Sequence, residues 1–310
     1  MKKTLVVSVI TAAMFNTVNA AEIYSNDKGF SYEVEGDLQV QLRKDFEDGA
    51  NLGVEFDDLE LENIFNYHIN ERSNMFAVLS FDSADAANGE SDAGTELSDA
   101  YIGLTYDNFT LSIGKQDYAI DDFGVEESYE MNSDSSGFDA QEDDGDDVIL
   151  VQYEHQYFTL VASTDLESEG TDSEGGKSYD LLAITSIDNL ELMVGYQSQA
   201  ESIDTEMTDT YGISLFYDAD FATFGGDYSK VENGSAIYNL ASTFKATDSV
   251  EVRLGYVGVE PEEDDSYGEW YTNVTYKFPE QKKLSVFAEI GQSSEEGYGL
   301  GYLAGVRFKF

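Results

Sequence analysis

Apolar and polar residues alternate along most of this chain. In the segment 31–42, the apolar side chains share one parity, and the acidic and amide side chains share the other. The segment 300–310 repeats the pattern, with apolar residues or alanine at every even position and both charges, Arg307 and Lys309, on the other face. A period of two predicts a β-strand with one face for an apolar medium and one for water. Strands of about ten residues with this pattern are typical of transmembrane barrels.

The same criterion predicts sixteen strands, at residues 31–42, 54–69, 74–82, 98–106, 109–116, 147–154, 157–165, 178–187, 190–198, 209–217, 221–230, 236–245, 249–258, 268–278, 283–291 and 300–310. Seven connections are tight, around Asn70, Asp107–Asn108, His155, Asp188–Asn189, Ala219, Thr247 and Gln281, and we expect the other eight to be long. The fold class predicted is therefore all-β, a 16-stranded antiparallel transmembrane β-barrel with short periplasmic turns and long extracellular loops.

Aromatic residues of the lipid-facing parity gather at the predicted strand ends. The periplasmic set is Tyr67, Phe109, Phe158, Tyr217, Phe221, Phe278, Phe308 and Phe310, and the extracellular set is Tyr179, Tyr196, Tyr211, Tyr256, Trp270 and Tyr302. Aliphatic residues such as Ile213, Leu254 and Val286 lie between the two sets. Two aromatic belts around an apolar band indicate two membrane interfaces.

The first twenty residues have the pattern of a secretory signal peptide. Lys2 and Lys3 precede an apolar stretch at 5–15, and Val18-Asn19-Ala20 precedes Ala21. The stretch is too short to span a bilayer, and Val18 and Ala20 are small residues at the two positions that a signal peptidase reads. We therefore expect residues 1–20 to be cleaved and residues 21–310 to form a single barrel domain.

The composition excludes several classes of protein. The chain has 63 acidic and 16 basic residues, for a formal charge of -47, which argues against nucleic acid as a partner and is compatible with cations. No mature segment approaches 18 consecutive apolar residues, so helical membrane spanning is excluded. The chain has no cysteine and no phosphate-binding glycine loop, so we predict no cofactor and no metal site.

The longest predicted connection, residues 117–146, follows the fifth strand. A sixteen-stranded barrel encloses a wide aqueous lumen that needs a constriction. We expect this third loop to fold inward and narrow the lumen.

Four stretches carry a resemblance to a known family. They are Leu97-Ser-Asp-Ala-Tyr-Ile-Gly-Leu104, Phe109-Thr-Leu-Ser-Ile-Gly-Lys-Gln116, Asp121-Asp-Phe-Gly124 and Gly305-Val-Arg-Phe-Lys-Phe310. They resemble the fourth strand, the fifth strand, the start of the third loop and the carboxy-terminal assembly signal of Gram-negative general porins. The resemblance implies a homotrimer in the cell outer membrane, among lipid and lipopolysaccharide. It also implies passive diffusion of small hydrophilic solutes and ions, and recognition of Gly305, Phe308 and Phe310 by the outer-membrane assembly machinery.

The resemblance further implies that third-loop carboxylates face a basic cluster on the barrel wall. The loop carboxylates are Asp117, Asp121, Asp122, Glu126 and Glu127, and the basic wall candidates are Arg43, Lys115 and Arg253. Ser98 occupies a position where family members often carry arginine, and the parity of Lys115 points it outward unless Gly114 carries a bulge. Isolated lumen charges paired with nearby acids remain an alternative to a basic ladder. Because acids outnumber bases, we expect a cation-selective pore and no enzyme activity.

Three other functions remain open at this point. An adhesin or receptor would act through acidic extracellular loops such as 142–147 and 261–265, which are either solvated or bridged by divalent cations to lipid. A barrel enzyme would have only His68 and His155 for a catalytic dyad, and both lie near predicted periplasmic turns. A sugar-specific channel would need a ladder of inward aromatics, for which Tyr106, Phe224 and Tyr271 are too scattered.

Overall fold

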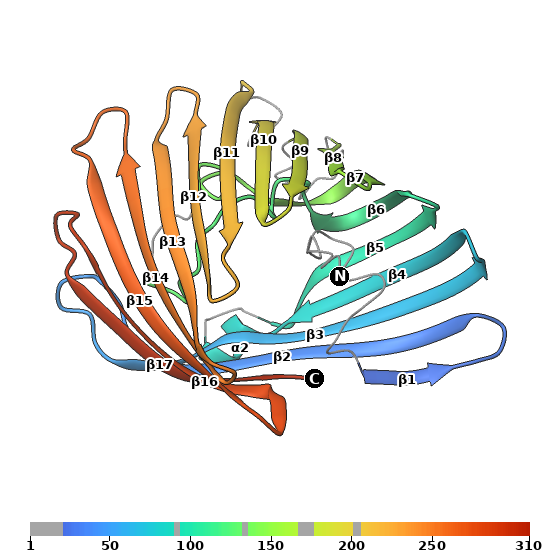
Figure 1. Cartoon of the computed structure of the whole chain (residues 1–310), viewed down its shortest axis with the longest axis horizontal. Helices are drawn as coiled ribbons and strands as arrows, with labels where there is room; N and C mark the ends of the chain where they lie inside the picture. Colours follow the sequence, from blue (N-terminus) through green and yellow to red (C-terminus); the bar gives the residue numbers. More distant parts are fainter. Residues whose placement is uncertain (1–20, 90–93, 132–135, 167–176, 201–205) are drawn as a thin grey trace.

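The computed structural model describes residues 21–89, 94–131, 136–166, 177–200 and 206–310. The predicted signal peptide, residues 1–20, lies outside this part of the chain. Within it, sixteen antiparallel strands close into a barrel, as predicted (Figure 1). The strands are β2 (Phe30–Lys44), β3 (Gly53–Asn70), β4 (Ser73–Asp82), β5 (Glu96–Tyr106), β6 (Phe109–Asp117), β7 (Asp144–His155), β8 (Phe158–Asp165), β9 (Lys177–Ile187), β10 (Leu190–Ala200), β11 (Thr208–Asp218), β12 (Ala222–Val231), β13 (Ala236–Thr247), β14 (Val250–Glu260), β15 (Tyr267–Phe278), β16 (Gln281–Ser293) and β17 (Leu300–Lys309).

Each strand pairs with its neighbour in sequence, and β17 pairs with β2 to close the barrel. In this closing pair, Val306 lies opposite Val40 and Phe308 opposite Leu38, so the apolar residues of both strands share the outer face. Beyond β17, the backbone N–H and C=O of Phe310 each form a 3.0 Å hydrogen bond with Gly36. A side chain at Gly36 would overlap the Phe310 ring, so the closing contact requires glycine there.

A further strand, β1 (Ala21–Ser25), was not predicted. It pairs with the start of β2, with Ala21 opposite Val34, and so lies along the same edge of β2 as β17. Its five residues are too few for alternation to distinguish a strand from a loop. Figure 1 shows β1 beside the beginning of β2.

The connections at one end of the barrel are tight turns, and this end is called the turn end below. Asp107 and Asp188 adopt positive φ angles of 51° and 55° there, as two-residue hairpin turns require. The opposite end, called the loop end, carries the longer connections. One connection at the loop end is shorter than expected: β12 and β13 are joined by residues 232–235 alone, with Asn233 at a φ of 54°.

The alternation of the sequence matches the two faces of the barrel. In β9, Tyr179 and Leu181 are exposed on the outside, whereas Ser178, Asp180 and Leu182 are buried on the inside. A short helix, α2 (Ala84–Asn88), lies after β4. The Asn88 side chain accepts a hydrogen bond from the Phe56 N–H at 2.7 Å and donates one to the Phe56 carbonyl at 2.8 Å. No helix in the described residues is long and apolar enough to cross a membrane.

Candidate pore constriction

Residues 118–143 connect β6 and β7 and fold into the barrel, as predicted for the third loop; residues 132–135 lie outside the described part of the chain. The start of this loop packs on the inner wall. Ile120, Phe123 and Phe138 are buried in one cluster with apolar residues of β7 to β10, among them Leu150 and Leu182. The loop and the wall together therefore form the main apolar core of the molecule.

Beyond this cluster, the loop follows the wall from strand to strand through hydrogen bonds of its backbone. The Ala119 N–H donates to Ser163 Oγ on β8 at 2.8 Å. The Val125 N–H donates to Asp227 Oδ2 on β12 at 2.9 Å, and the Glu127 N–H donates to the Tyr271 hydroxyl on β15 at 2.8 Å.

The loop then reaches β16 and β2. The N–H groups of Tyr129, Glu130 and Met131 all donate to the carboxylate of Glu289 on β16, at 2.8 to 2.9 Å. The Glu130 carboxylate forms an ion pair with Arg43 on β2, with a closest N–O distance of 2.5 Å. The described residues of the loop thus form a band along the wall from β7 to β2, with the Glu130 carboxylate close to Asp57 on β3. The inner face of β3 to β6 away from this contact is called the uncovered wall below.

The uncovered wall and the start of the loop are both acidic. Asp117, which is the last residue of β6 and not a loop residue as predicted, lines a cavity with Asp121 and Asp122 of the loop, Glu62 on β3 and Asp99 on β5. Burial, reinforced by the neighbouring Asp117 and Asp122 carboxylates, raises the pKa of Asp121 to about 8. Three of the five predicted loop acids therefore gather at one place, opposite wall acids that had not been predicted.

The other two predicted acids lie farther along the band. Glu126 accepts a hydrogen bond from the N–H of Ser128 within the loop. Glu127 forms an ion pair with Arg253 on β14 at 3.2 Å. Burial is the main cause of the raised pKa of Glu127, and Arg253 opposes it.

The three predicted basic residues have different surroundings. Arg43 contacts Asp45 at 2.6 Å and Glu55 at 3.3 Å as well as Glu130. Arg253 contacts Glu127, as described above. The structure does not bring Lys115 to the five loop acids, because its ion-pair partners are Asp144 and Asp146, at 3.4 and 2.9 Å.

Two basic residues of the lumen were not among the predicted wall candidates. Arg307 on β17 contacts Asp37 at 2.5 Å and Asp58 at 2.8 Å, and Lys309 contacts Asp37 at 2.8 Å. Their parity, opposite to the lipid-facing residues of the last strand, was the signal that could have identified them. These contacts favour the alternative in which isolated lumen bases are paired with nearby acids.

Two of the aromatics expected on the inner face lie outside. Phe224 is 41 % exposed and pairs with Tyr217 on the outer face of β11, and Tyr106 is 50 % exposed beside Arg72 at the turn end. Only Tyr271 is inside, buried beneath the loop. The wrong assignments follow from errors of one residue in register, which exchange the two faces of a strand.

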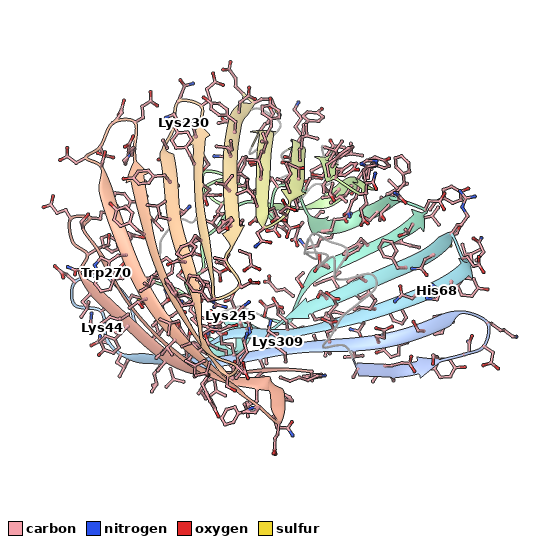
Figure 2. The ribbon with its side chains drawn as sticks, viewed as in Figure 1. Lys44, His68, Lys230, Lys245, Trp270 and Lys309 are labelled. Carbon is pink, nitrogen blue, oxygen red and sulfur yellow. The ribbon has the colours of Figure 1, made fainter. Side chains whose placement is uncertain are left out.

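The histidines lie at the turn end of the barrel. Figure 2 shows His68 at the end opposite to Lys44 and Trp270. The ring of His155 lies among aromatic rings, 4.9 Å from that of Phe158 and 5.4 Å from that of Tyr157. His68 lines a pocket at the turn end together with Ser73, Thr105 and Asp107.

The assembly-signal residues lie at the closing strand. Gly305 and Phe308 are paired across β17 and β2 with Gln41 and Leu38. The rings of Phe308 and Phe310 lie 5.6 Å apart.

A closed sixteen-stranded barrel with a long loop folded against its inner wall defines an outer-membrane channel protein. The chain matches the family described as Gram-negative porin over residues 10–298, and it belongs to that family. It is located in the outer membrane of a Gram-negative bacterium.

Two curated relatives are similar over most of their lengths. Porin-like protein H of Photobacterium profundum is 24% identical, with all of both chains covered. Outer membrane protein U of Vibrio parahaemolyticus is 28% identical over 90% of this chain and 86% of that protein.

Solved structures share the fold at lower identity. OmpT of Vibrio cholerae in its trimer form has a TM-score of 0.74 and 18% identity, covering 91% of this chain and 100% of that one. OmpF of Salmonella typhi, solved with daunomycin, has a TM-score of 0.73 and 13% identity, covering 94% and 100%.

Proposed function

We propose that this porin forms a water-filled, cation-selective channel for the passive diffusion of small hydrophilic solutes and ions, without enzyme activity. The observation that carries the proposal is the position of the loop. The band formed by residues 118–131 lies against β7 to β2, and we infer that permeating ions pass between this band and the acidic wall of β3 to β6. Asp117, Asp121 and Asp122 are the proposed acidic edge of this opening.

The balance of lumen charges supports cation selectivity. The bases Arg43, Arg253 and Arg307 each contact at least two carboxylates, so their positive charge is offset locally. The acids of the uncovered wall outnumber its bases, and where these acids are ionised a negative potential of about two kT would concentrate monovalent cations roughly sevenfold. Glu126 and Glu127 also belong to the proposed constriction, where Glu127 is paired with Arg253.

Three further features belong to the proposal. Residues 1–20 act as a cleaved signal peptide, and Gly305, Phe308 and Phe310 are read by the outer-membrane assembly machinery. The mature barrel is a homotrimer, for which the trimer form of OmpT is a precedent of the same fold.

A liposome-swelling assay with uncharged sugars of graded size tests the channel itself. We expect swelling rates that fall smoothly with solute size and depend little on sugar stereochemistry. Swelling with one sugar alone would indicate a substrate-specific channel. A folded barrel that gives no swelling and no ion current would contradict the proposal and favour the adhesin or receptor function.

A further inference from the structure

The bases of the lumen are distributed unevenly between the two ends of the barrel. Among the described residues, the lumen-facing bases in the turn halves of their strands belong to β13 to β17, and they are Lys245, Arg253, Lys277, Lys283, Arg307 and Lys309. In the loop halves, the lumen-facing base within the same part of the chain is Arg43 on β2. Figure 2 shows Lys245 and Lys309 away from the loop end, where Lys44 and Lys230 lie.

Strand pairing places the bases of β13 to β15 on the inner face. Lys245 lies opposite Glu251, and the Glu251 carboxylate contacts Lys277 at 2.8 Å and Arg253 at 3.7 Å. Glu251 lies opposite Thr275, which is 3 % exposed on the inner wall of β15. Three bases of three neighbouring strands thus surround one carboxylate near the turn end.

The bases of the last two strands continue this group. Ser285 on β16 lies opposite Arg307, and Lys283 has the same inward parity as Ser285. Lys309 lies opposite Asp37 and contacts it at 2.8 Å. The basic group therefore follows the turn end of the wall from β13 to the closing strand.

The acids of the lumen have a different distribution. In the turn half, acids such as Asp37, Glu191 and Glu251 offset the bases, so the two signs of charge are close to balance there. In the loop half, Arg43 is far outnumbered by acids of the wall and of the third loop. These acids include Glu55, Asp99, Asp117, Asp121, Asp122 and Glu130.

A pore with one acidic half and one balanced half conducts differently in the two directions. The acidic half enriches cations and excludes anions, whereas the balanced half holds both ions at similar concentrations. When the voltage drives cations from the acidic half into the balanced half, anions arriving from the other mouth are held back at the acidic half. Both ions then accumulate in the balanced half and the conductance rises. The reverse voltage draws both ions out of the balanced half, so the conductance falls.

We propose that this distribution of lumen charge makes the channel rectify, so that it carries more current when cations move from the loop end to the turn end than in the reverse direction. The inference rests on the proposed channel function. The bases of β13 to β17 are essential to it, because they keep the turn half from being as acidic as the loop half.

The primary test records current at equal and opposite voltages in symmetric KCl, read immediately after each voltage step so that channel closure does not contribute. We expect a ratio of the two currents of about 1.5 at 0.1 M KCl, where the Debye length is about 10 Å, and a ratio near 1 at 1 M KCl, where it is about 3 Å. The larger current should flow when the compartment facing the loop end is positive.

The orientation of each channel is read from a label at the turn end. The chain has no cysteine, and Gln156 is exposed in the turn between β7 and β8. Gln156→Cys can therefore be biotinylated selectively, without a change of charge. Streptavidin added to one compartment then shows which compartment the turn end faces.

Lys245→Gln combined with Lys277→Gln tests the source of the asymmetry. The double variant removes two bases from the turn half, so this half becomes acidic as well and the two halves become more alike. We expect the current ratio at 0.1 M KCl to fall below about 1.2, while the cation preference in a KCl gradient rises. Folding is checked by heat-modifiable electrophoresis. If the double variant does not fold, Lys245→Gln alone decides the question, because Lys245 is exposed at the end of β13.

Lys177→Gln combined with Lys230→Gln is the matched control. It changes the net charge by the same amount, but both residues lie on the outer face at the loop end. Lys230 lies opposite Tyr211, which is 52 % exposed, and Lys177 has the outward parity of Tyr179. The current ratio of this control should match that of wild type.

Arg43→Gln should change the ratio in the opposite direction. It also removes a lumen base, but from the loop half, so the difference in charge between the two halves increases. The current ratio should therefore exceed that of wild type. A purely structural disturbance would not lower the ratio in one variant and raise it in the other.

Failure of this inference is distinguishable from failure of the proposed function. Absence of any current in wild type would contradict the channel itself. A conducting wild type with equal currents in both directions at 0.1 M KCl, or with the larger current in the opposite direction, would overturn the rectification alone. An unchanged ratio in a folded Lys245→Gln, Lys277→Gln variant would also overturn it.

Discussion

Replacement of Gly212 by valine tests whether apolar docking holds the third loop. Gly212 lies on the inner face of β11 beneath two loop rings. An added β-carbon would lie 2.5 Å from Cζ of Phe123 and 2.8 Å from Cε2 of Phe138, so both rings would have to move. One ring cannot move without the other, because the two rings pack against each other with centroids 4.8 Å apart.

The loss of docking free energy expected for Gly212→Val follows from the burial of the Phe123 and Phe138 rings. Phe123 is 6 % and Phe138 1 % exposed, and burying a phenylalanine side chain contributes about 2 kcal/mol. Displacing both rings therefore weakens docking of the loop by up to about 4 kcal/mol, which shifts the docked-to-free equilibrium by up to roughly three orders of magnitude. Valine favours strands, so β11 itself should remain intact.

The assay is single-channel recording of Gly212→Val beside Gly226→Val. Gly226 lies on the outer face of the neighbouring strand β12, where an added β-carbon would meet only Leu240 Cδ2 at 3.2 Å and the Asn239 carbonyl at 3.5 Å. We expect frequent transitions between conductance levels for Gly212→Val and steady current for Gly226→Val. Steady, wild-type current in a folded Gly212→Val barrel would refute apolar docking as a main restraint on the loop.

Three other predictions follow from single contacts. Because the pKa of Asp121 is raised to about 8, its carboxyl is protonated at pH 6 and ionised at pH 9. The preference of the channel for cations, measured by reversal potential, should therefore rise from pH 6 to pH 9. The Asp121→Asn variant should show a smaller rise. Arg253→Gln leaves Glu127 without its ion pair, so cation permeability relative to anions should increase roughly twofold in the same measurement, whereas a shift toward anions would contradict the charge balance inferred for the lumen. Gly36→Leu would collide with the Phe310 ring, so the yield of heat-modifiable barrel should fall sharply, and a normal yield would show that this contact is dispensable for closure.

Most of the barrel could be predicted because the pattern of each strand depends on residues that are close together in the sequence. Alternation with a period of two follows from the pleat of each strand, and it recurs wherever lipid and water face opposite sides of one sheet. The short strand β1 and the tight connection 232–235 were missed because a few residues carry too little periodicity to classify.

The route of the third loop could not be predicted, because it depends on contacts between distant residues. Tyr129 and Glu289 are 160 positions apart, and no local pattern relates them. Parity indicated that Glu289 and Arg307 face the lumen, but which acids, bases or backbone groups they meet depends on strand stagger and on the loop. The acidic residues of the loop could be listed from the sequence. Only the structure shows that Asp117, Asp121 and Asp122 share one cavity, whereas Glu126 and Glu127 lie farther along the loop.

The zero-current potential of the purified protein in a planar bilayer under a tenfold KCl gradient shows whether the channel prefers cations. A cation-selective channel gives a potential with the sign of the potassium equilibrium potential and a magnitude below the limit of about 59 mV for a perfectly selective monovalent channel. The magnitude should shrink as the salt concentration of both compartments is raised, because the Debye length falls from about 10 Å at 0.1 M to about 3 Å at 1 M. A potential of the opposite sign would mean that the lumen bases dominate permeation, and the acidic opening proposed here would be wrong.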